Sequence, residues 1–183
     1  FPVLQLASWT ISVIPETGAP GLVVQARNSF FLALAAALLC VGLSVVIAYA
    51  ARLDRGALTR SLGKVVLLGY SVPGAVIAVG VLVAALAVGR LTGTGTAIIT
   101  GSAAALLFGY VVRFMAVSFL SVEAGFARTS GSLQSSSRVL GAAPFRTLRR
   151  IELPLLRRSL LAATILVFID VLKELPLTLI LRP

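Results

Sequence analysis

Four long apolar segments constrain the fold of this chain more than any other feature. A helix needs about 20 residues to cross the hydrocarbon core of a bilayer, and residues 29–51, 65–88, 97–120 and 159–181 meet that length. Charged residues make up only 12% of the chain, against about 25% in soluble domains. Because a spanning backbone must satisfy its own hydrogen bonds, the sequence predicts an all-α membrane protein, a polytopic helical bundle with about four complete spans.

The N-terminal region differs from the rest. Residues 1–14 are apolar but too short to span, and prolines and glycines then mark a loop: Pro15, Gly18, Pro20 and Gly21. We interpret residues 1–25 as the end of a preceding span and an external loop, and 26–183 as a transmembrane domain with a cytoplasmic loop at 121–158. The chain opens on Phe1 without a charged leader, so we expect a piece of a longer polypeptide, truncated at both ends.

Positive charge predicts the orientation of the spans. The link after the first span holds Arg52, Arg55, Arg60 and Lys64. The link after the third holds Arg128, Arg138, Arg146, Arg149, Arg150, Arg157 and Arg158. The link between them has only Arg90. The positive-inside rule therefore places the first and third links in the cytoplasm and the second outside. The basic residues of these links account for the net charge of +10. Because aromatic residues do not alternate with the basic ones, nucleic-acid binding is not expected.

Enzyme and metal chemistry have little support in the composition. The chain has no histidine, and Cys40 is its only cysteine, inside an apolar run. These counts exclude disulfides and thiolate metal sites and remove the commonest general base. We expect Cys40 to be a small buried hydrophobe, and we assign no catalytic residue, metal ligand or cofactor. A glycine-rich ATP-binding loop is also missing, so ATP would have to bind elsewhere.

The second span contains a proline inside the sequence "LLGYSVPGAVIAVGVLVAALAV". Pro73 removes a backbone hydrogen bond and disfavours helix at the preceding residue, which a membrane tolerates only where the freed groups face protein or a cavity. Small residues four apart also allow another helix to approach: Gly74 with Ala78, and Gly80 with Ala84. Pro73 and Gly74 are therefore candidates for a translocation path, and a simple packing kink is the alternative.

The fourth span carries Asp170, Lys173 and Glu174 at its middle. Each such charge costs roughly 2.5–3.5 kcal/mol on insertion scales. Lys173 can pair with Asp170, while Glu174 would lie on the same helical face and leave it net negative. We expect this face to line a path or cavity; a structural polar clasp is the alternative. Arg113, near the cytoplasmic end of the third span, is expected to extend to the surface.

The link after the third span predicts two short helices. Ser132 can cap the first, which would run through Leu140, and Gly141 suits the left-handed position after it. Pro144 fits the first turn of the second helix, and Pro154 would close it. On that second helix an apolar face is formed by Phe145, Leu148 and Glu152 or Leu155, with Ile151 alongside. Such a helix lies on acidic lipid headgroups or docks into a partner, and its periodicity does not separate the two.

The spacing in this link resembles a known motif. Gly141, nine residues, and Ile151-x-Leu153-Pro154 are similar to the cytoplasmic "EAA" loop of ABC importer permeases, E-A-A-x-x-x-G-x(9)-I-x-L-P. Three serines stand where that pattern has Glu-Ala-Ala: Ser135, Ser136 and Ser137. The resemblance implies a coupling helix that sits in a cleft of the ATPase subunit. The implied coupling residues are these serines with Gly141, Phe145, Leu148, Ile151, Leu153 and Pro154.

Three further stretches point to one branch of these permeases: "LLGYSVPGAVIAVGVL", "GYVVRFMAV" and "VLKELPLTLILRP". They are similar to the second half of two-part ferric iron permeases, a branch of the same superfamily as polyamine, thiamine and phosphonate permeases. The resemblance implies a non-enzymatic transport subunit in a bacterial or archaeal inner membrane. Its implied partners are a separate ATPase dimer, an external substrate-binding protein, membrane lipid, and the other half of the permease, in the same polypeptide or as a second copy. A channel, a scaffold and a membrane-embedded enzyme are the alternatives from other classes.

Overall fold

The computed structural model describes residues 3–5, 8–9, 19–53, 56–93, 102–129, 136–137 and 139–182. Every regular element in these ranges is helical, which confirms the all-α prediction. The chain divides into two compact units, residues 1–32 and 33–183. The first unit contains two short helical pieces, at 3–5 and 8–9, and the beginning of helix α2; the second contains the rest.

Helix α2, Ala19–Leu53, begins ten residues earlier than the first predicted span. Pro20 and Gly21, which we expected in a loop, lie in its first turn. Proline is tolerated there because the first turn of a helix does not use its N–H groups; Pro15 and Gly18 lie outside the described residues. In the second unit, α2 buries the small side chains of Ala36, Ala37 and Cys40, so Cys40 is a buried hydrophobe as predicted.

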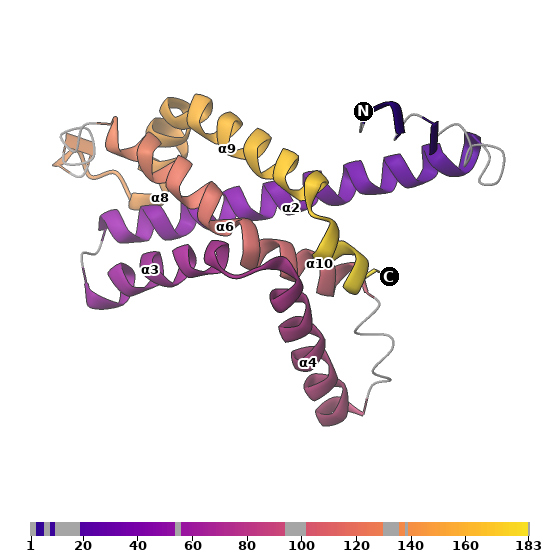
Figure 1. The fold of residues 1–183 in the computed structure, drawn as a ribbon. Helices are drawn as coiled ribbons and strands as arrows, with labels where there is room; N and C mark the ends of the chain where they lie inside the picture. The colour runs from indigo at the N-terminus through magenta and orange to yellow at the C-terminus, as the bar shows by residue number, and fades with distance from the viewer. Residues whose placement is uncertain are drawn as a thin grey trace. The chain divides into compact units, whose positions relative to one another are not determined.

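The second and fourth predicted spans are each divided into two helices. The division of the second follows the interruption expected at Pro73, whereas the division of the fourth was not predicted. The second is divided between α3, Ala57–Ser71, and α4, Gly74–Thr92. The fourth is divided between α9, Leu153–Lys173, and α10, Leu175–Ile180. Figure 1 shows α4 turning away from the direction of α3, and α10 turning away from α9. Proline causes both breaks, as the site geometry below explains.

The third span is helix α6, Ala103–Ala127. Its N-terminus is capped by the Ser102 hydroxyl, which accepts a hydrogen bond from the Ala105 N–H at 3.2 Å; residues 97–101 lie outside the described residues. The helix continues seven residues past Leu120, so the region we assigned to the cytoplasmic loop begins as helix.

Three helical segments in the described ranges are long and apolar enough to cross a membrane: Pro20–Leu53, Gly74–Leu91 and Ala103–Ala127. Helix α9 has 21 residues but carries four charged side chains: Arg157, Arg158, Asp170 and Lys173. The predicted fourth span therefore depends on whether these charges have partners in the membrane or reach its surface.

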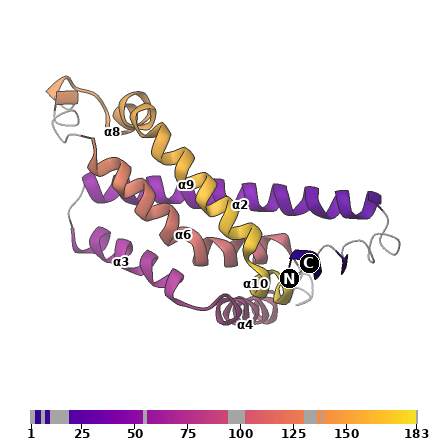
Figure 2. The ribbon, with the colours of Figure 1, turned by 45° about the horizontal axis from the view of Figure 1, so that its top comes forward.

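The core of the second unit lies between α2, α6 and α9. Helices α6 and α9 run side by side in both Figure 1 and Figure 2. The central cluster of buried side chains consists of Val41, Val45, Ala48, Tyr49, Phe119, Val122, Phe126, Leu156 and Ala163. Many large apolar side chains on the same helices remain exposed, among them Leu38, Leu43 and Leu120. Helices with apolar side chains on their outer surface are typical of proteins surrounded by lipid.

Gly125 lies in a close contact of α6 with α9. A Cβ atom at position 125 would lie 2.7 Å from both Cβ and Oγ of Ser159, and 2.9 Å from Cδ2 of Leu156. Those distances are shorter than side-chain contacts allow, so only glycine permits this crossing without a shift of the helices.

Arg52 brings the C-terminal ends of α2 and α6 together. Its guanidinium donates hydrogen bonds to the Phe126 carbonyl at 3.2 Å and to the Thr129 hydroxyl at 2.9 Å, and it lies 5.1 Å from the centre of the Phe126 ring. The links after the first and third spans therefore leave the helices at the same end, as the predicted alternation requires. We call this end, which carries Arg52, Arg128, Arg157 and Arg158, the basic end.

We expect Gly125→Ala to destabilise the α6–α9 pair by about 1–3 kcal/mol, because the added methyl group overpacks the crossing. Gly42→Ala is the matched control, since a Cβ atom at position 42 of α2 has nothing within 4 Å. Thermal unfolding of both purified variants in detergent measures the difference. Equal midpoints for Gly125→Ala and the parent protein would show that the crossing does not require glycine.

Candidate functional site

Arg113 of α6 joins the two helix breaks. Its Nε donates a hydrogen bond to Oε2 of Glu174 at 2.9 Å and forms an ion pair with it. Its NH1 group donates to the carbonyl of Val72. The side chains of Arg113 and Glu174 are 21% and 9% exposed. One guanidinium group therefore contacts the break between α3 and α4 and the break between α9 and α10. We call this group of residues the Arg113 junction.

The first break follows from Pro73. Val72 adopts an extended conformation, as expected for a residue that precedes proline, and α4 restarts at Gly74. The Pro73 carbonyl accepts hydrogen bonds from the N–H groups of Val76 and Ile77 at 3.0 and 3.2 Å. The Val72 carbonyl has lost its helical partner, and Arg113 supplies a donor in its place. The prediction that Pro73 interrupts the helix where protein satisfies the backbone is confirmed.

The second break follows from Pro176. Proline has no N–H to donate to the carbonyl four residues earlier, so α9 ends at Lys173, and Pro176 lies in the first turn of α10. Thr178 donates its hydroxyl hydrogen to the Glu174 carbonyl. The hydroxyl groups of Thr178 and Tyr110 lie 2.7 Å apart, which ties α10 to α6.

Gly74 has no room for a side chain, because a Cβ atom there would overlap Oε1 of Glu174. That oxygen is buried and has no hydrogen-bond partner among the described residues. The junction therefore brings together three of the predicted path residues, Pro73, Gly74 and Glu174, from elements about a hundred residues apart in sequence. Of the two predicted small-residue pairs, Gly74 and Ala78 are buried, whereas Gly80 has open space beside it.

Asp170 and Lys173 do not join this group as predicted. Glu174 has an extended conformation outside α9, so it does not continue the helical face of Asp170. Lys173 is exposed and Asp170 is half-buried, and within the described ranges no ion pair links these two side chains. The predicted Asp170–Lys173 pair is therefore not present in this structure, and the predicted path role of both residues stays a prediction.

The expectation that Arg113 reaches the membrane surface was wrong. Helix α6 extends to Ala127, so Arg113 lies near the middle of its 25 residues, where its nearest partners are Glu174 and Val72. A signal in the sequence could have identified it. The fourth span holds two acidic residues and one lysine and so has one uncompensated negative charge, and Arg113 is the single positive charge inside the third predicted span.

The Arg113 junction is a neutral, hydrogen-bonded polar group inside an apolar helix bundle. Two isolated charges at this depth would be costly, and pairing offsets part of that cost. Within the described ranges no group of three His, Cys, Asp or Glu side chains lies close enough together to hold a metal ion. What the arrangement can do is fix the relative positions of α4, α6 and α10 through one side chain.

The segment with the motif spacing has the predicted turn. Gly141 has φ = +75°, the left-handed conformation that we expected, and Pro144 begins helix α8, Pro144–Thr147, also as predicted. The proposal that Pro154 closes this helix was wrong. The chain continues through a π-helical turn, η1, Leu148–Glu152, directly into α9. The wider turn lets the Leu153 N–H bond to the Leu148 carbonyl, so the helix accommodates Pro154 at a position where proline otherwise clashes with an α-helical backbone.

Two contacts fix the base of this segment. The Tyr49 hydroxyl of α2 donates to the Pro144 carbonyl at 2.7 Å. The hydroxyl groups of Ser137 and Thr147 lie 3.0 Å apart, and both side chains are buried. Ser137, at the position of the last alanine in the resembled motif, therefore anchors the turn. Ser136 is exposed, and Ser132, Ser135 and Arg138 lie outside the described residues.

The exposed apolar side chains of this segment differ from the predicted face. Leu148 and Leu153 pack against the core of their own unit, and Ile151 is half-buried, whereas Phe145 is 71% exposed and Pro154 is exposed. Val139 and Leu140, each 86% exposed, were missed, because the predicted face counted only the second helix. We call Val139, Leu140 and Phe145 the apolar tip. The sequence did contain a signal for this exposed surface, because two apolar residues directly precede the glycine that forms the turn.

Glu152 lies buried below this segment, with 4% of its surface exposed. Burial raises the pKa of its carboxyl group, and the positive charge of Arg52 opposes that rise in part. Its Oε2 has no hydrogen-bond partner among the described residues. Because the folded state raises this pKa, the contribution of Glu152 to stability falls as the pH rises above the ordinary pKa of a glutamate.

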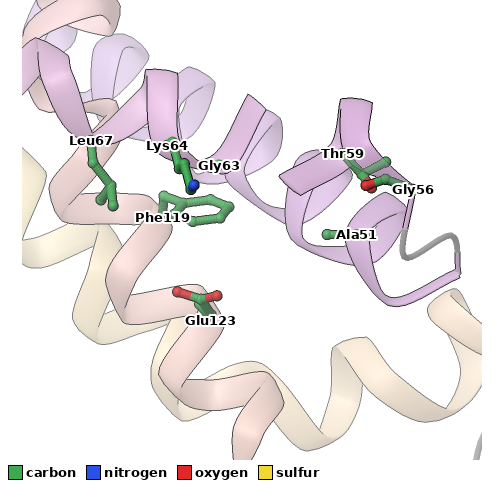
Figure 3. A pocket seen from close by; sticks show the side chains of 8 residues that line it. All are labelled: Ala51, Gly56, Thr59, Gly63, Lys64, Leu67, Phe119 and Glu123. Atoms are coloured by element: carbon green, nitrogen blue, oxygen red, sulfur yellow. The ribbon is translucent and has the colours of Figure 1, made fainter. Parts of the chain in front are cut away.

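A cavity of about 310 Å³ lies between the end of α2, α3 and α6. Figure 3 shows Lys64 above the Phe119 ring and Glu123 on the next turn of α6. Both charged residues line the cavity, and both are exposed. The cavity opens near the basic end and is separate from the Arg113 junction.

We expect Arg113→Gln to destabilise the protein by about 3–5 kcal/mol, because it leaves the Glu174 carboxylate buried without its cation. The double variant Arg113→Gln/Glu174→Gln should recover part of this loss, because neither charge remains. Lys173→Gln, at an exposed neighbouring position, is the control for removing one charge. Thermal unfolding in detergent measures all three. Equal losses for Arg113→Gln and Lys173→Gln would contradict a stabilising role for the junction.

Residues 41–182 match the family described as the binding-protein-dependent transport system inner membrane component. A comparison with curated proteins finds no significant match. The family match includes the Arg113 junction and the Gly141 segment, and together with the apolar helices it makes the protein a multi-pass integral membrane protein. The chain therefore belongs to the family of inner-membrane components of binding-protein-dependent transport systems, the permeases of ABC importers.

Proposed function

We propose that this permease couples to a separate ATPase subunit through the segment around Gly141 and that its cargo is ferric iron. The observation that carries the coupling proposal is the apolar tip beside Gly141. Three large apolar side chains are exposed there, at the end of the molecule that also holds the basic links. In water such side chains favour burial against a protein partner.

The construction of the segment supports a mechanical role. Its base is tied to α2 by Tyr49 and to its own turn by the Ser137–Thr147 contact. From Pro144 the helix runs through η1 into α9 without a gap. A push on the apolar tip would therefore move α9, which packs along α6. ATP binding and hydrolysis in the partner would shift the helices between outward-open and inward-open arrangements.

The Arg113 junction supports the proposal that the translocation path runs beside the two helix breaks. Broken helices at membrane depth are tolerated where they are buried in protein or line a water-filled cavity, and both breaks of this chain meet at Arg113. In this proposal Pro73, Gly74 and Glu174 border the path, and Asp170 and Lys173 extend it along α9.

The ferric iron cargo is supported by the three sequence stretches that resemble ferric iron permeases. Fe(III) prefers hard oxygen ligands, but Glu174 is paired with Arg113, so the junction is not built to hold a bare cation. In this proposal an external binding protein selects the cargo and the permease carries it. Polyamine, phosphonate and thiamine are the alternative cargoes within the same class of importers.

In the proposed orientation the basic end faces the cytoplasm of a bacterial or archaeal cell. ATP is hydrolysed by the partner ATPase dimer. The other half of the permease is a second copy or another part of the same polypeptide.

Truncating the apolar tip should weaken ATPase binding. We expect the triple variant Val139→Ala/Leu140→Ala/Phe145→Ala to lose at least about tenfold in affinity, since central apolar anchors each contribute more than about 1 kcal/mol. The matched control is Val76→Ala/Val79→Ala/Val83→Ala, which removes three exposed valines of α4. Pull-down of the ATPase in detergent measures both. Undiminished binding by the tip variant would refute the docking assignment.

Cargo should be identified by uptake. We expect cells that lack the chromosomal permease to regain growth under iron limitation when the whole permease is restored. Under the same conditions Gly141→Val should fail, because a side chain is strained by about 1–2 kcal/mol in the left-handed conformation. Uptake of radioactive iron and of labelled polyamine, measured side by side, separates the cargoes. Restored polyamine uptake without iron uptake would overturn the iron proposal and leave the coupling proposal intact.

A further inference from the structure

A second groove lies between α6 and α9 at the basic end, on surfaces that neither the Arg113 junction nor the apolar tip uses. Its volume is about 260 Å³. The lining residues are Ser121, Ala124, Gly125, Arg128, Arg158, Ser159 and Ala162. The first four come from the end of α6 and the residue after it, and the last three from α9.

The residues that line the groove carry positive charge and would favour an anion. Arg128 and Arg158 border it, and none of its lining residues is acidic. Both guanidinium groups are exposed, and in the described part of the chain neither forms an ion pair. Arginine binds phosphate oxygens with two parallel hydrogen bonds, and the Ser159 hydroxyl adds a third donor side chain. The Ser121 hydroxyl already donates to the Val117 carbonyl at 2.9 Å and is not needed for this set.

The floor of the groove is rigid and small. Gly125 lies directly against Ser159, with no room for a Cβ atom between them, and the small side chains of Ala124 and Ala162 line the groove beside this contact. An anion would ordinarily be disfavoured at the C-terminus of α6, where free carbonyl groups give a negative potential. Arg52 offsets this effect, because it donates hydrogen bonds to the carbonyls of Phe126 and Thr129.

We propose that this groove binds the headgroup of an anionic phospholipid, with Arg128 and Arg158 on its phosphate group. A lipid is favoured over a soluble anion because the groove lies at the end of α6, one of the helices long and apolar enough to cross a membrane. Exposed apolar side chains, Leu161 and Ile165, follow Arg158 and Ser159 along α9. Basic pockets between transmembrane helices on the cytoplasmic side recognise such headgroups. The inference rests on the proposed orientation, in which the basic end faces the anionic cytoplasmic leaflet.

Native mass spectrometry of the purified permease in detergent tests the proposal, with phosphatidylglycerol as the anionic probe and phosphatidylcholine as the zwitterionic one. We expect preferential binding of phosphatidylglycerol. The variant Arg128→Gln/Arg158→Gln should lower its apparent affinity about 25-fold, at roughly a factor of five for each arginine near an anionic lipid surface. Arg149→Gln/Arg150→Gln, which removes the same charge from exposed positions, should lower it less than about threefold.

Two further experiments distinguish a specific lipid site from diffuse charge attraction and from a site for a soluble anion. Ala162→Leu keeps every charge but fills the groove, so it should also abolish preferential binding. Inorganic phosphate should not displace the lipid. Equal losses for the two arginine pairs, or full binding by Ala162→Leu, would show diffuse attraction and overturn the proposal. Displacement by phosphate would assign the groove to a soluble anion instead. Loss of ATPase pull-down by Arg128→Gln/Arg158→Gln without lipid would assign it to the protein partner.

Binding in detergent has no sidedness, so it decides the groove independently of the orientation. Labelling of a cysteine at Ser136 with an impermeant thiol reagent decides the orientation. We expect labelling only from the inside of vesicles of known sidedness. Labelling from outside would overturn the proposed topology, and with it the assignment to the cytoplasmic leaflet.

Discussion

A proline-broken backbone inside a bilayer must find hydrogen-bond partners in the protein, and in this chain one arginine serves two such breaks. Arg113 donates to the freed carbonyl of Val72 and to the carboxylate of Glu174. Without a donor at this point the Val72 carbonyl would lack a hydrogen-bond partner, which costs several kcal/mol inside a bilayer. Arg113 therefore ties the positions of both α4 and α10 to α6, and the Tyr110–Thr178 hydrogen bond adds a second tie to α10. The Arg113 junction is also a natural point for two arrangements of the helices to differ, because a hydrogen-bonded ion pair is either formed or broken.

The Gly141 segment combines a fixed base with an exposed tip. Tyr49 ties the base to α2 and the Ser137–Thr147 hydrogen bond closes the turn on itself, whereas Val139, Leu140 and Phe145 have most of their surface free. A rigid base allows a force on the apolar tip to reach α9. The force would be transmitted along the continuous helical backbone that runs from Pro144 into α9. The serine at position 137 shows how a departure from the resembled Glu-Ala-Ala pattern can still serve the same turn, since its hydroxyl gains a partner that alanine lacks.

Three prolines show how much of the helix geometry local sequence propensity predicts. Pro73 and Pro176 each interrupt a helix, whereas Pro154, with the same chemistry, lies inside a continuous helical segment. The difference is the π-helical turn before Pro154, which depends on how Leu148 and Leu153 pack against the core. Propensity predicts that proline disturbs a helix. The tertiary packing determines whether the disturbance becomes a break or a wider turn.

The sequence by itself determined the helical class, the approximate positions of the membrane segments, the left-handed turn at Gly141 and the break at Pro73. These features depend on local quantities: the length of apolar runs, the missing N–H of proline and the absence of a glycine side chain. Only the tertiary structure decided that Glu174 pairs with Arg113 rather than continuing the face of Asp170. It also decided that Leu148 turns inward while Val139 and Leu140 stay exposed. Both outcomes depend on which side chains meet across helices distant in sequence, and no periodicity along one helix specifies that.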